Sequence, residues 1–408
     1  MDAPAQRKPA LGFIFITLVL LVLGFGIIIP VLPKLIVAFE GGSFAEGSSS
    51  YGWLVSVFAV MQFIASPILG SLSDRFGRRK IILLALAGSA VDYVIMGLAP
   101  SLMWLFVARI ISGMTAGALA TCNAYIADVT PPEKRAQGFG LVGAAFGLGF
   151  VIGPAIGGLL GQVSIRLPFF VAAGCVGANW LYGAFVLPES LPPESRRPFS
   201  WRRANPVGSL IALRRFRGVF DLALMHFIFM FGNSMLQSIW VLYTGYRYHW
   251  TTFEVGLSLT FIGVMAVVVQ GGLVRRIIAW TGERRGLVIG LVISALVMAA
   301  YGTATQGWMI YWLIVLAAWG GIAGPSAQSL ITRHVPANEQ GAVQGSLSGL
   351  TSLAGIGAPV LAAWSFGKCI PNLPGVAFYE ASALILVALA LALRSFRLDD
   401  RVGAMAHP

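Results

Sequence analysis

Two ionisable residues, Asp92 and Arg109, lie inside long apolar runs of this sequence. Charged side chains are costly in an apolar environment, so residues placed there are candidates for function. If both runs are helices, Asp92 lies about 18 Å from one end of its helix and Arg109 about 12 Å from the opposite end of the next. These depths add to the roughly 30 Å of a hydrocarbon core, so the two residues are predicted at one level. Their pairing could be a static ion pair that fixes helix packing, or protonation of Asp92 could drive a conformational step.

A second cluster of charge lies between two apolar runs, in the sequence GSLSDRFGRRK at positions 70–80. One acid, Asp74, is surrounded there by four cations: Arg75, Arg78, Arg79 and Lys80. Cations at such a position anchor a membrane boundary against anionic headgroups, each by about 1 kcal/mol. Asp128 and Arg135 are expected at a similar depth, where they either extend this charge network or are plain boundary charges.

The other reactive side chains form no pattern typical of enzymes or metal sites. Three cysteines are too scattered for a disulfide framework, and four histidines lack metal-ligand spacing. The sequence has no P-loop, nucleophile elbow or dinucleotide fingerprint. We therefore expect no ATP hydrolysis, no catalytic residues, no metal and no cofactor.

The composition is that of a membrane protein. Of 408 residues, 57% are hydrophobic and 11% are charged, and the mean hydropathy is +0.81. A helix that crosses the hydrocarbon core needs about 20 apolar residues. The sequence predicts twelve such helices, near 11–33, 51–71, 80–98, 102–127, 136–160, 167–187, 218–243, 253–274, 286–304, 308–331, 340–365 and 376–394. The predicted fold class is an all-α membrane protein with twelve transmembrane helices.

Positive charge is distributed unevenly along the chain. A net charge of +12 would by itself suit a nucleic-acid binder. If the N-terminus is cytoplasmic, however, most of the 28 Lys and Arg residues fall in segments predicted to be inside. This pattern predicts two cytoplasmic termini and argues against nucleic acid as a partner. The first apolar run is too long for a secretory signal and lacks a cleavage site, so it is interpreted as the first span.

The sequence also repeats itself. A shift of 205 residues aligns 127–154 with 332–359, so that Pro131 meets Pro336. Such a repeat is typical of transporters built from two related halves. The predicted domains are an N-terminal six-helix half at 1–190, a cytoplasmic basic linker at 191–217 and a C-terminal six-helix half at 218–408. The last part of the linker forms either a short amphipathic surface helix or a solvated basic segment.

Several motifs resemble those of the major facilitator superfamily. The turn at 70–80 is similar to the signature between helices 2 and 3, RIISGMTAGALA (109–120) to the fourth-helix motif, and GLGFVIGPAIGG (147–158) to the fifth-helix antiporter motif. Longer pieces, such as IIIPVLPKL (27–35) and SIWVLYTGYRYHW (238–250), resemble the tetracycline-efflux branch. The likeness runs over nearly the whole chain, and it implies a fold of two pseudo-symmetric six-helix halves.

The resemblance implies a gating role for the basic turn. In this superfamily Asp74 is expected to latch the cytoplasmic ends of the two halves, partly through the N-terminal dipole of the eleventh helix. The candidate gating residues are Gly70, Asp74, Arg75, Gly77, Arg78, Arg79, Asp128 and Arg135.

Glycines recur every four residues along the predicted fifth helix: Gly149, Gly153, Gly157 and Gly161. This spacing leaves one stripe of the helix without side chains, so a neighbouring helix can approach closely. Pro154 removes a backbone hydrogen bond and is expected to bend the helix. The family comparison adds Gly158 to this motif and implies that the bend helps the halves to rock.

Three positions depart from the tetracycline-efflux pattern. That branch is expected to carry carboxylates in helices 1 and 9 and a histidine in helix 8, where this sequence has Leu21, Ser294 and Ala266. Asp92, Arg109 and Gln62 match the branch and are the candidates for proton coupling or substrate binding. The departures leave both tetracycline as the substrate and the usual proton coupling open.

The resemblance also implies a cavity lined by helices 1, 4, 7 and 10. Besides Arg109, these helices offer polar and aromatic candidates: Asn123, Asn233, Gln237, Trp240, Tyr243, Trp319 and Gln328. Such a lining suits a mostly apolar organic molecule with scattered polar groups. Each of these residues could instead serve helix packing.

The leading functional prediction is secondary efflux of an amphipathic organic solute or drug by alternating access, in exchange for protons through Asp92. An alternative is an uncoupled facilitator or importer of an organic anion, in which Asp92 and Arg109 are structural. A more remote one is a non-transporting membrane receptor or scaffold. The expected setting is a bacterial inner membrane, with the protein as a monomer and the lipid bilayer, protons and a small organic substrate as its partners.

Overall fold

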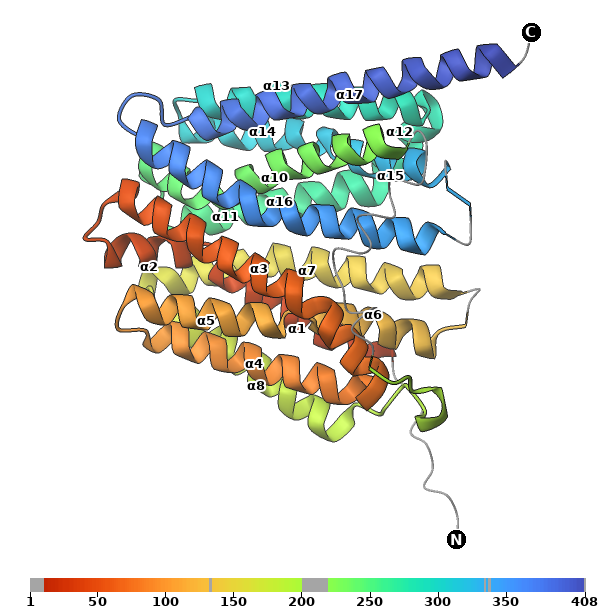
Figure 1. The fold of residues 1–408 in the computed structure, drawn as a ribbon. Coiled ribbons are helices and arrows are strands. Elements are labelled where there is room, and N and C mark those ends of the chain that lie inside the picture. The colour runs from red at the N-terminus through yellow and green to blue at the C-terminus, as the bar shows by residue number, and fades with distance from the viewer. Residues whose placement is uncertain (1–10, 132–133, 200–218, 334, 337–338, 407–408) are drawn as a thin grey trace. The chain divides into compact units, whose positions relative to one another are not determined.

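The structure, a computed structural model, describes residues 11–131, 134–199, 219–333, 335–336 and 339–406. Within these residues the chain forms helices joined by short turns (Figure 1). Twelve helical segments are long and apolar enough to cross a membrane. This confirms the predicted fold class of twelve transmembrane helices.

The first six spans comprise eight helices. They are α1 (Leu11–Ile28), α2 (Leu32–Phe39), α3 (Phe44–Phe76), α4 (Arg78–Leu98), α5 (Leu102–Thr115), α6 (Ala118–Val129), α7 (Arg135–Val163) and α8 (Leu167–Val186). The short helix η2 (Pro193–Ser195) follows in the linker. The amphipathic helix considered for the last part of the linker lies outside the described residues.

The last six spans comprise a similar series. They are α10 (Val219–Tyr248), α11 (Thr252–Val268), the π-helical segment η4 (Val269–Leu273), α12 (Val274–Thr281), α13 (Glu283–Thr303), α14 (Gly307–Gly320), α15 (Ala323–Arg333), α16 (Gln340–Cys369) and α17 (Val376–Ala406).

The chain divides into two compact units, each with its own core. Unit 1 comprises Met1–Leu35, Val60–Asn205 and Thr251–Thr260, and unit 2 comprises Ile36–Ala59, Pro206–Trp250 and Phe261–Pro408. Each unit therefore includes a short segment from the other half of the sequence. The boundaries of the two predicted domains, 1–190 and 218–408, stay a prediction.

Four predicted spans are not single α-helices, and one of them, the eighth, contains the π-helical segment η4. The first, fourth and tenth are broken. The first breaks between α1 and α2, where Pro30 and Pro33 lack the amide hydrogen that a continuous helix needs. The fourth breaks at Ala116, whose amide donates to the Gly113 carbonyl, and the tenth breaks at Gly321, whose amide donates to the Ala318 carbonyl. Each of these last two hydrogen bonds closes a tighter 3₁₀ turn within the span.

The breaks repeat with the same spacing as the sequence. Helices α4, α5 and α6 begin 205 residues before α13, α14 and α15, respectively. Gly77 and Gly282, also 205 residues apart, precede α4 and α13 with φ angles of 100° and 76°. Side chains rarely adopt such angles, so both turns favour glycine. The repeat seen in the sequence thus extends to the backbone.

The core of unit 1 is built around α1, which packs against α7 and α8, while α4 lies beside α8 (Figure 1). The glycine stripe of α7 faces α1. A Cβ atom at Gly153 would lie 2.8 Å from the Cα of Gly26, and one at Gly157 would collide with the Ile27 carbonyl oxygen. These glycines therefore allow the two helix backbones to touch.

The core of unit 2 is built around α10, which packs against α16 and α17. Its centre is aromatic. Trp240 packs edge-on against Tyr301, with ring centroids 5.2 Å apart, and Tyr243 packs against Phe378 at 4.6 Å. The Tyr243 hydroxyl donates to the Tyr301 carbonyl at 2.8 Å, so its polar group is satisfied within the core.

The contact between α7 and α1 predicts a sharp difference between two glycines of one helix. Gly157→Ala should lower the apparent melting temperature in detergent, because α1 must move to admit the methyl group, at a cost of about 1–3 kcal/mol. Gly143→Ala is the matched control, since a Cβ there meets nothing within 4 Å. Equal melting temperatures for the two variants would contradict this account of the packing.

Candidate functional site

A buried ion pair joins α4 to α5 in unit 1. Arg109 Nη2 donates to Asp92 Oδ2 at 2.8 Å, and the side chains are 7% and 0% exposed, respectively. The same guanidinium nitrogen contacts the sulfur of Met96 at 3.2 Å, and Ser112 lies close to the carboxylate. The structure therefore brings together the two residues that the sequence places at one depth.

This pair can respond to a proton. In an apolar environment the two opposite charges stabilise one another, because neither is solvated by water. A proton bound to Asp92 would remove that attraction and leave a buried guanidinium that favours an anion or an electron-rich oxygen. The same pair can equally hold α4 against α5.

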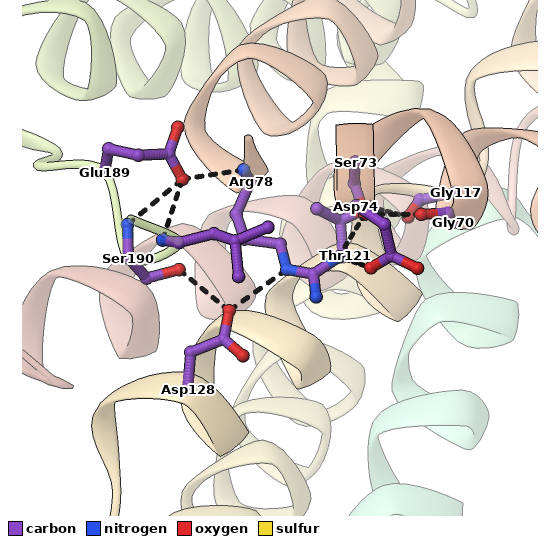
Figure 2. Close-up of polar contacts among 10 residues, drawn as sticks. Gly70, Ser73, Asp74, Arg78, Gly117, Thr121, Asp128, Glu189 and Ser190 are labelled. Atoms are coloured by element: carbon purple, nitrogen blue, oxygen red, sulfur yellow. Dashed lines mark hydrogen bonds and ion pairs between the residues drawn. The ribbon is translucent and has the colours of Figure 1, made fainter. Parts of the chain in front are cut away.

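A network of polar contacts lies at the end of unit 1 where α4 begins (Figure 2). Arg78 is its centre. Its side chain donates to Asp74 Oδ1 at 2.6 Å, to Asp128 Oδ2 at 3.0 Å and to the hydroxyl of Ser73 at 2.5 Å. One buried guanidinium thus links the end of α3 to the end of α6.

Glu189 completes this network, and the sequence analysis missed it. Its Oε1 atom accepts the amide hydrogen of Arg78 at 2.7 Å and those of Ser190 and Leu191 at 3.1 and 3.2 Å (Figure 2). A carboxylate there compensates the unpaired amides and the positive dipole at the start of α4. A Cβ at Gly77 would collide with the same carboxylate. The contact joins residues 111 positions apart, so no local spacing signals it.

The other predicted gating residues lie at the edge of this network. Arg79 donates to the Ala184 carbonyl at 2.5 Å, and the guanidinium of Arg75 lies 5.0 Å from the ring centroid of Phe76. The Gly70 carbonyl accepts the Ser73 hydroxyl at 2.8 Å. Arg135 begins α7, and its side chain lies outside the described residues. The latch between Asp74 and the eleventh helix stays a prediction.

Unit 2 carries the equivalent ion pair with its charges exchanged. The positions 205 residues after Arg78 and Asp128 are Glu283 and Arg333, and these side chains pair at 2.8 Å. The hydroxyl of Ser329 donates to the same Glu283 oxygen at 2.6 Å. The repeat therefore keeps the bond between the two helices and reverses its polarity.

The residues predicted to line a cavity fall into two groups. Trp240 and Tyr243 are buried in the aromatic core of unit 2, which favours a packing role for them. Asn233 donates to the Phe229 carbonyl of its own helix at 2.9 Å. The less enclosed cavity candidates are the exposed Gln237 and Trp319, and Gln328, which donates to Gln344 at 2.9 Å. Gln62, a candidate for proton coupling or substrate binding, is half-buried.

Three polar residues inside the spans of unit 1 show what the sequence could and could not predict. Asn123, in α6, has a buried side-chain oxygen without a hydrogen-bond partner among the described residues, and it remains a candidate for a substrate contact. Thr17 and Asn179, which were not predicted, join α1 to α8 through hydrogen bonds of 3.2 and 3.3 Å. Single polar residues in apolar runs were the available signal, but their partners are more than 160 positions apart.

The described residues form twelve apolar helical segments in two repeated series, and an ion pair is buried in the first series. These features define an integral membrane protein of the transporter class. The chain belongs to the Major Facilitator Superfamily, whose family model matches residues 14–359 and 222–403.

Its relatives include proteins of the tetracycline-resistance branch. The chain is 38% identical to the tetracycline resistance protein of class C from Escherichia coli over 384 residues, which cover 94% of this chain and 96% of the relative. It is 36% identical to the class D protein from Salmonella ordonez over 398 residues, covering 95% and 98%. The resemblance to this branch is thereby confirmed.

The fold is also that of a solved transporter. The crystal structure of the human organic anion transporter MFSD10 (TETRAN) matches with a TM-score of 0.70 and 25% identity, covering 96% of this chain and 100% of that chain.

The position of Glu189 predicts that it stabilises the start of α4. Glu189→Ala should lower the apparent melting temperature in detergent, by about 1–2 kcal/mol of unfolding free energy, because three amides lose their acceptor. Glu189→Gln should fall between this variant and wild type, since it keeps an oxygen but loses the charge. Glu194→Ala, an exposed acid of the same segment, is the control. Identical melting temperatures for Glu189→Ala and Glu194→Ala would exclude the capping role.

Proposed function

We propose that this protein exports an amphipathic organic drug across the membrane by alternating access, in exchange for protons. The observation that carries the proposal is the ion pair of Asp92 and Arg109, which is buried inside two adjacent spans. A charged pair at this depth is costly unless it serves a function or a partner stabilises it. The relatives named for tetracycline resistance support a drug as the cargo.

In this proposal the proton acts through the contact between α4 and α5. Protonation of Asp92 weakens its attraction to Arg109, so the two helices can separate or rotate. The 3₁₀ turn at Ala116 follows Arg109 by two turns of the same span and provides a place where the helix can bend. Loss of the proton to the opposite side restores the pair and resets the transporter.

The proposed substrate has a large apolar surface and a few oxygen or nitrogen groups. Amides such as Asn123 and Gln237, together with the exposed ring of Trp319, suit a molecule of this kind. Leu21, Ser294 and Ala266 offer no charge for proton coupling. The proposal therefore assigns the coupling to unit 1 alone.

The proposal places the protein in a bacterial inner membrane with both termini in the cytoplasm, as a monomer. The distribution of Lys and Arg supports this orientation, and the bacterial origin of the tetracycline-resistance relatives supports the membrane.

A second candidate function is uncoupled movement of an organic anion. Two observations favour it: the guanidinium of Arg109 lies deep in a span, and the structure resembles that of a human organic anion transporter. Here Asp92 has a structural role, and the substrate gradient alone sets the direction of transport.

Transport in proteoliposomes separates these functions. Tetracyclines, other antibiotics and organic anions are tested for counterflow and for flux driven by a pH gradient, with wild type and Asp92→Asn. For proton exchange, the gradient drives flux in wild type, whereas Asp92→Asn keeps counterflow and loses at least about 90% of the driven flux. Asp400→Asn is the matched control, because its ion pair with Arg284 is exposed and contributes little.

Other outcomes contradict the proton-exchange proposal. If flux does not depend on the pH gradient, and Asp92→Asn weakens counterflow and net flux equally, the acid is a structural partner of Arg109. Transport restricted to organic anions would then support the second function.

A further inference from the structure

A cleft of about 550 Å³ opens at the end of unit 2 where α13 begins. Its lining residues come from α12, α13 and α15 and the turn between α12 and α13. Three of them are arginines: Arg284, Arg285 and Arg333. The cleft is separate from the Asp92 pair, which belongs to unit 1.

The cleft carries a net positive charge. Glu283 is its only acidic lining residue, and the charge of its carboxylate is compensated by Arg333, while the hydroxyl of Ser329 donates a hydrogen bond to it. Arg284 pairs with Asp400 at 2.6 Å, but both side chains are well exposed, so this contact is easily exchanged. No ion pair among the described residues involves Arg285. The cleft can therefore accept an anion.

One wall of the cleft is apolar, and an aromatic residue stands next to it. Ile278, Ala279 and Leu330 supply apolar lining. Trp280, in the same turn of α12, is 92% exposed, the largest exposure among the large hydrophobic side chains of the described residues. Tryptophan is enriched where a membrane meets water, because one end of its ring is polar. Cationic and apolar groups together suit an amphipathic ligand at that boundary.

The equivalent turn of unit 1, before α4, indicates that a negatively charged group suits this site. At the start of α4, the carboxylate of Glu189 binds the first amide of the helix and crowds Gly77. The position 205 residues later is Arg394, a cation, and a Cβ at Gly282 would meet nothing within 4 Å. Unit 1 thus holds a carboxylate against the turn before α4, whereas the equivalent turn of unit 2 borders an open cleft whose one acid, Glu283, is paired with Arg333.

We propose that this cleft binds the phosphate group of an anionic membrane lipid. Guanidinium groups bind phosphate with two parallel hydrogen bonds, and the apolar wall contacts the start of the acyl chains. The predicted orientation places this end of unit 2 at the cytoplasmic leaflet, which attracts such basic segments to its anionic lipids. A free phosphate ion shares the headgroup chemistry but has no acyl chain to bury.

Native mass spectrometry of the full chain in detergent tests the proposal. The protein is titrated with dioleoyl phosphatidylglycerol, with dioleoyl phosphatidylcholine and with inorganic phosphate. We expect phosphatidylglycerol to bind most tightly, and Arg285→Gln to weaken that binding about five- to tenfold. Arg276→Gln is the matched control: this exposed arginine of α12 lies outside the cleft and should change the affinity less than about twofold.

The remaining variants and ligands test whether paired donors are needed and whether the ligand is a lipid or a free phosphate. Arg285→Lys keeps the charge but not the paired donors, so it should fall between Arg285→Gln and wild type. Equal weakening by Arg276→Gln, equal binding of phosphatidylcholine, or tight binding of inorganic phosphate without a preference for the lipid would each overturn the proposal. Because the readout is lipid binding, it is independent of whether the protein exchanges drugs for protons.

Discussion

The structure depends on one constraint, namely that a charge in the hydrocarbon region needs a partner. Asp92 and Arg109 satisfy it by pairing at 2.8 Å, and this pairing fixes how α4 faces α5. At the membrane boundary the same constraint is met by Arg78, which is shared between Asp74 and Asp128. Both ion pairs involve α4, so the position of that helix determines the electrostatics of unit 1.

The two units have equivalent helices but different side chains at the positions of the buried ion pair. Helices α4 and α13 begin 205 residues apart, and so do α5 and α14. The residues equivalent to Asp92 and Arg109, however, are Val297 and Ile314, which are buried and apolar. Unit 2 thus preserves the helix contact through ordinary apolar packing, while unit 1 makes it with charge. Protonation of Asp92 would therefore have no counterpart at the equivalent position of unit 2, which is Val297.

The sequence was sufficient for the features that follow from composition and spacing. Twelve apolar runs gave twelve spans, and the depths of Asp92 and Arg109 indicated one level, because helical rise converts position into distance. It was insufficient where contacts join distant segments. Glu189 follows the sixth span as an ordinary linker acid, and only the folded chain brings it to the amide of Arg78. The breaks at Ala116 and Gly321 were also missed, because a 3₁₀ turn leaves the apolar pattern unchanged.

The reversed polarity of the two boundary pairs constrains how the repeats could diverge. Arg78 with Asp128 and Glu283 with Arg333 cannot be interconverted by one substitution. Replacing either member by its opposite creates two like charges at the same short distance, which repel. A stepwise path that avoids such an intermediate first replaces one member by a neutral residue, so that a single charge and its hydrogen bonds hold the contact at that stage. A duplicated ancestor with one charge order would therefore have crossed a stage with one neutral member in one copy, and a hybrid that mixes one helix from each repeat would place like charges together.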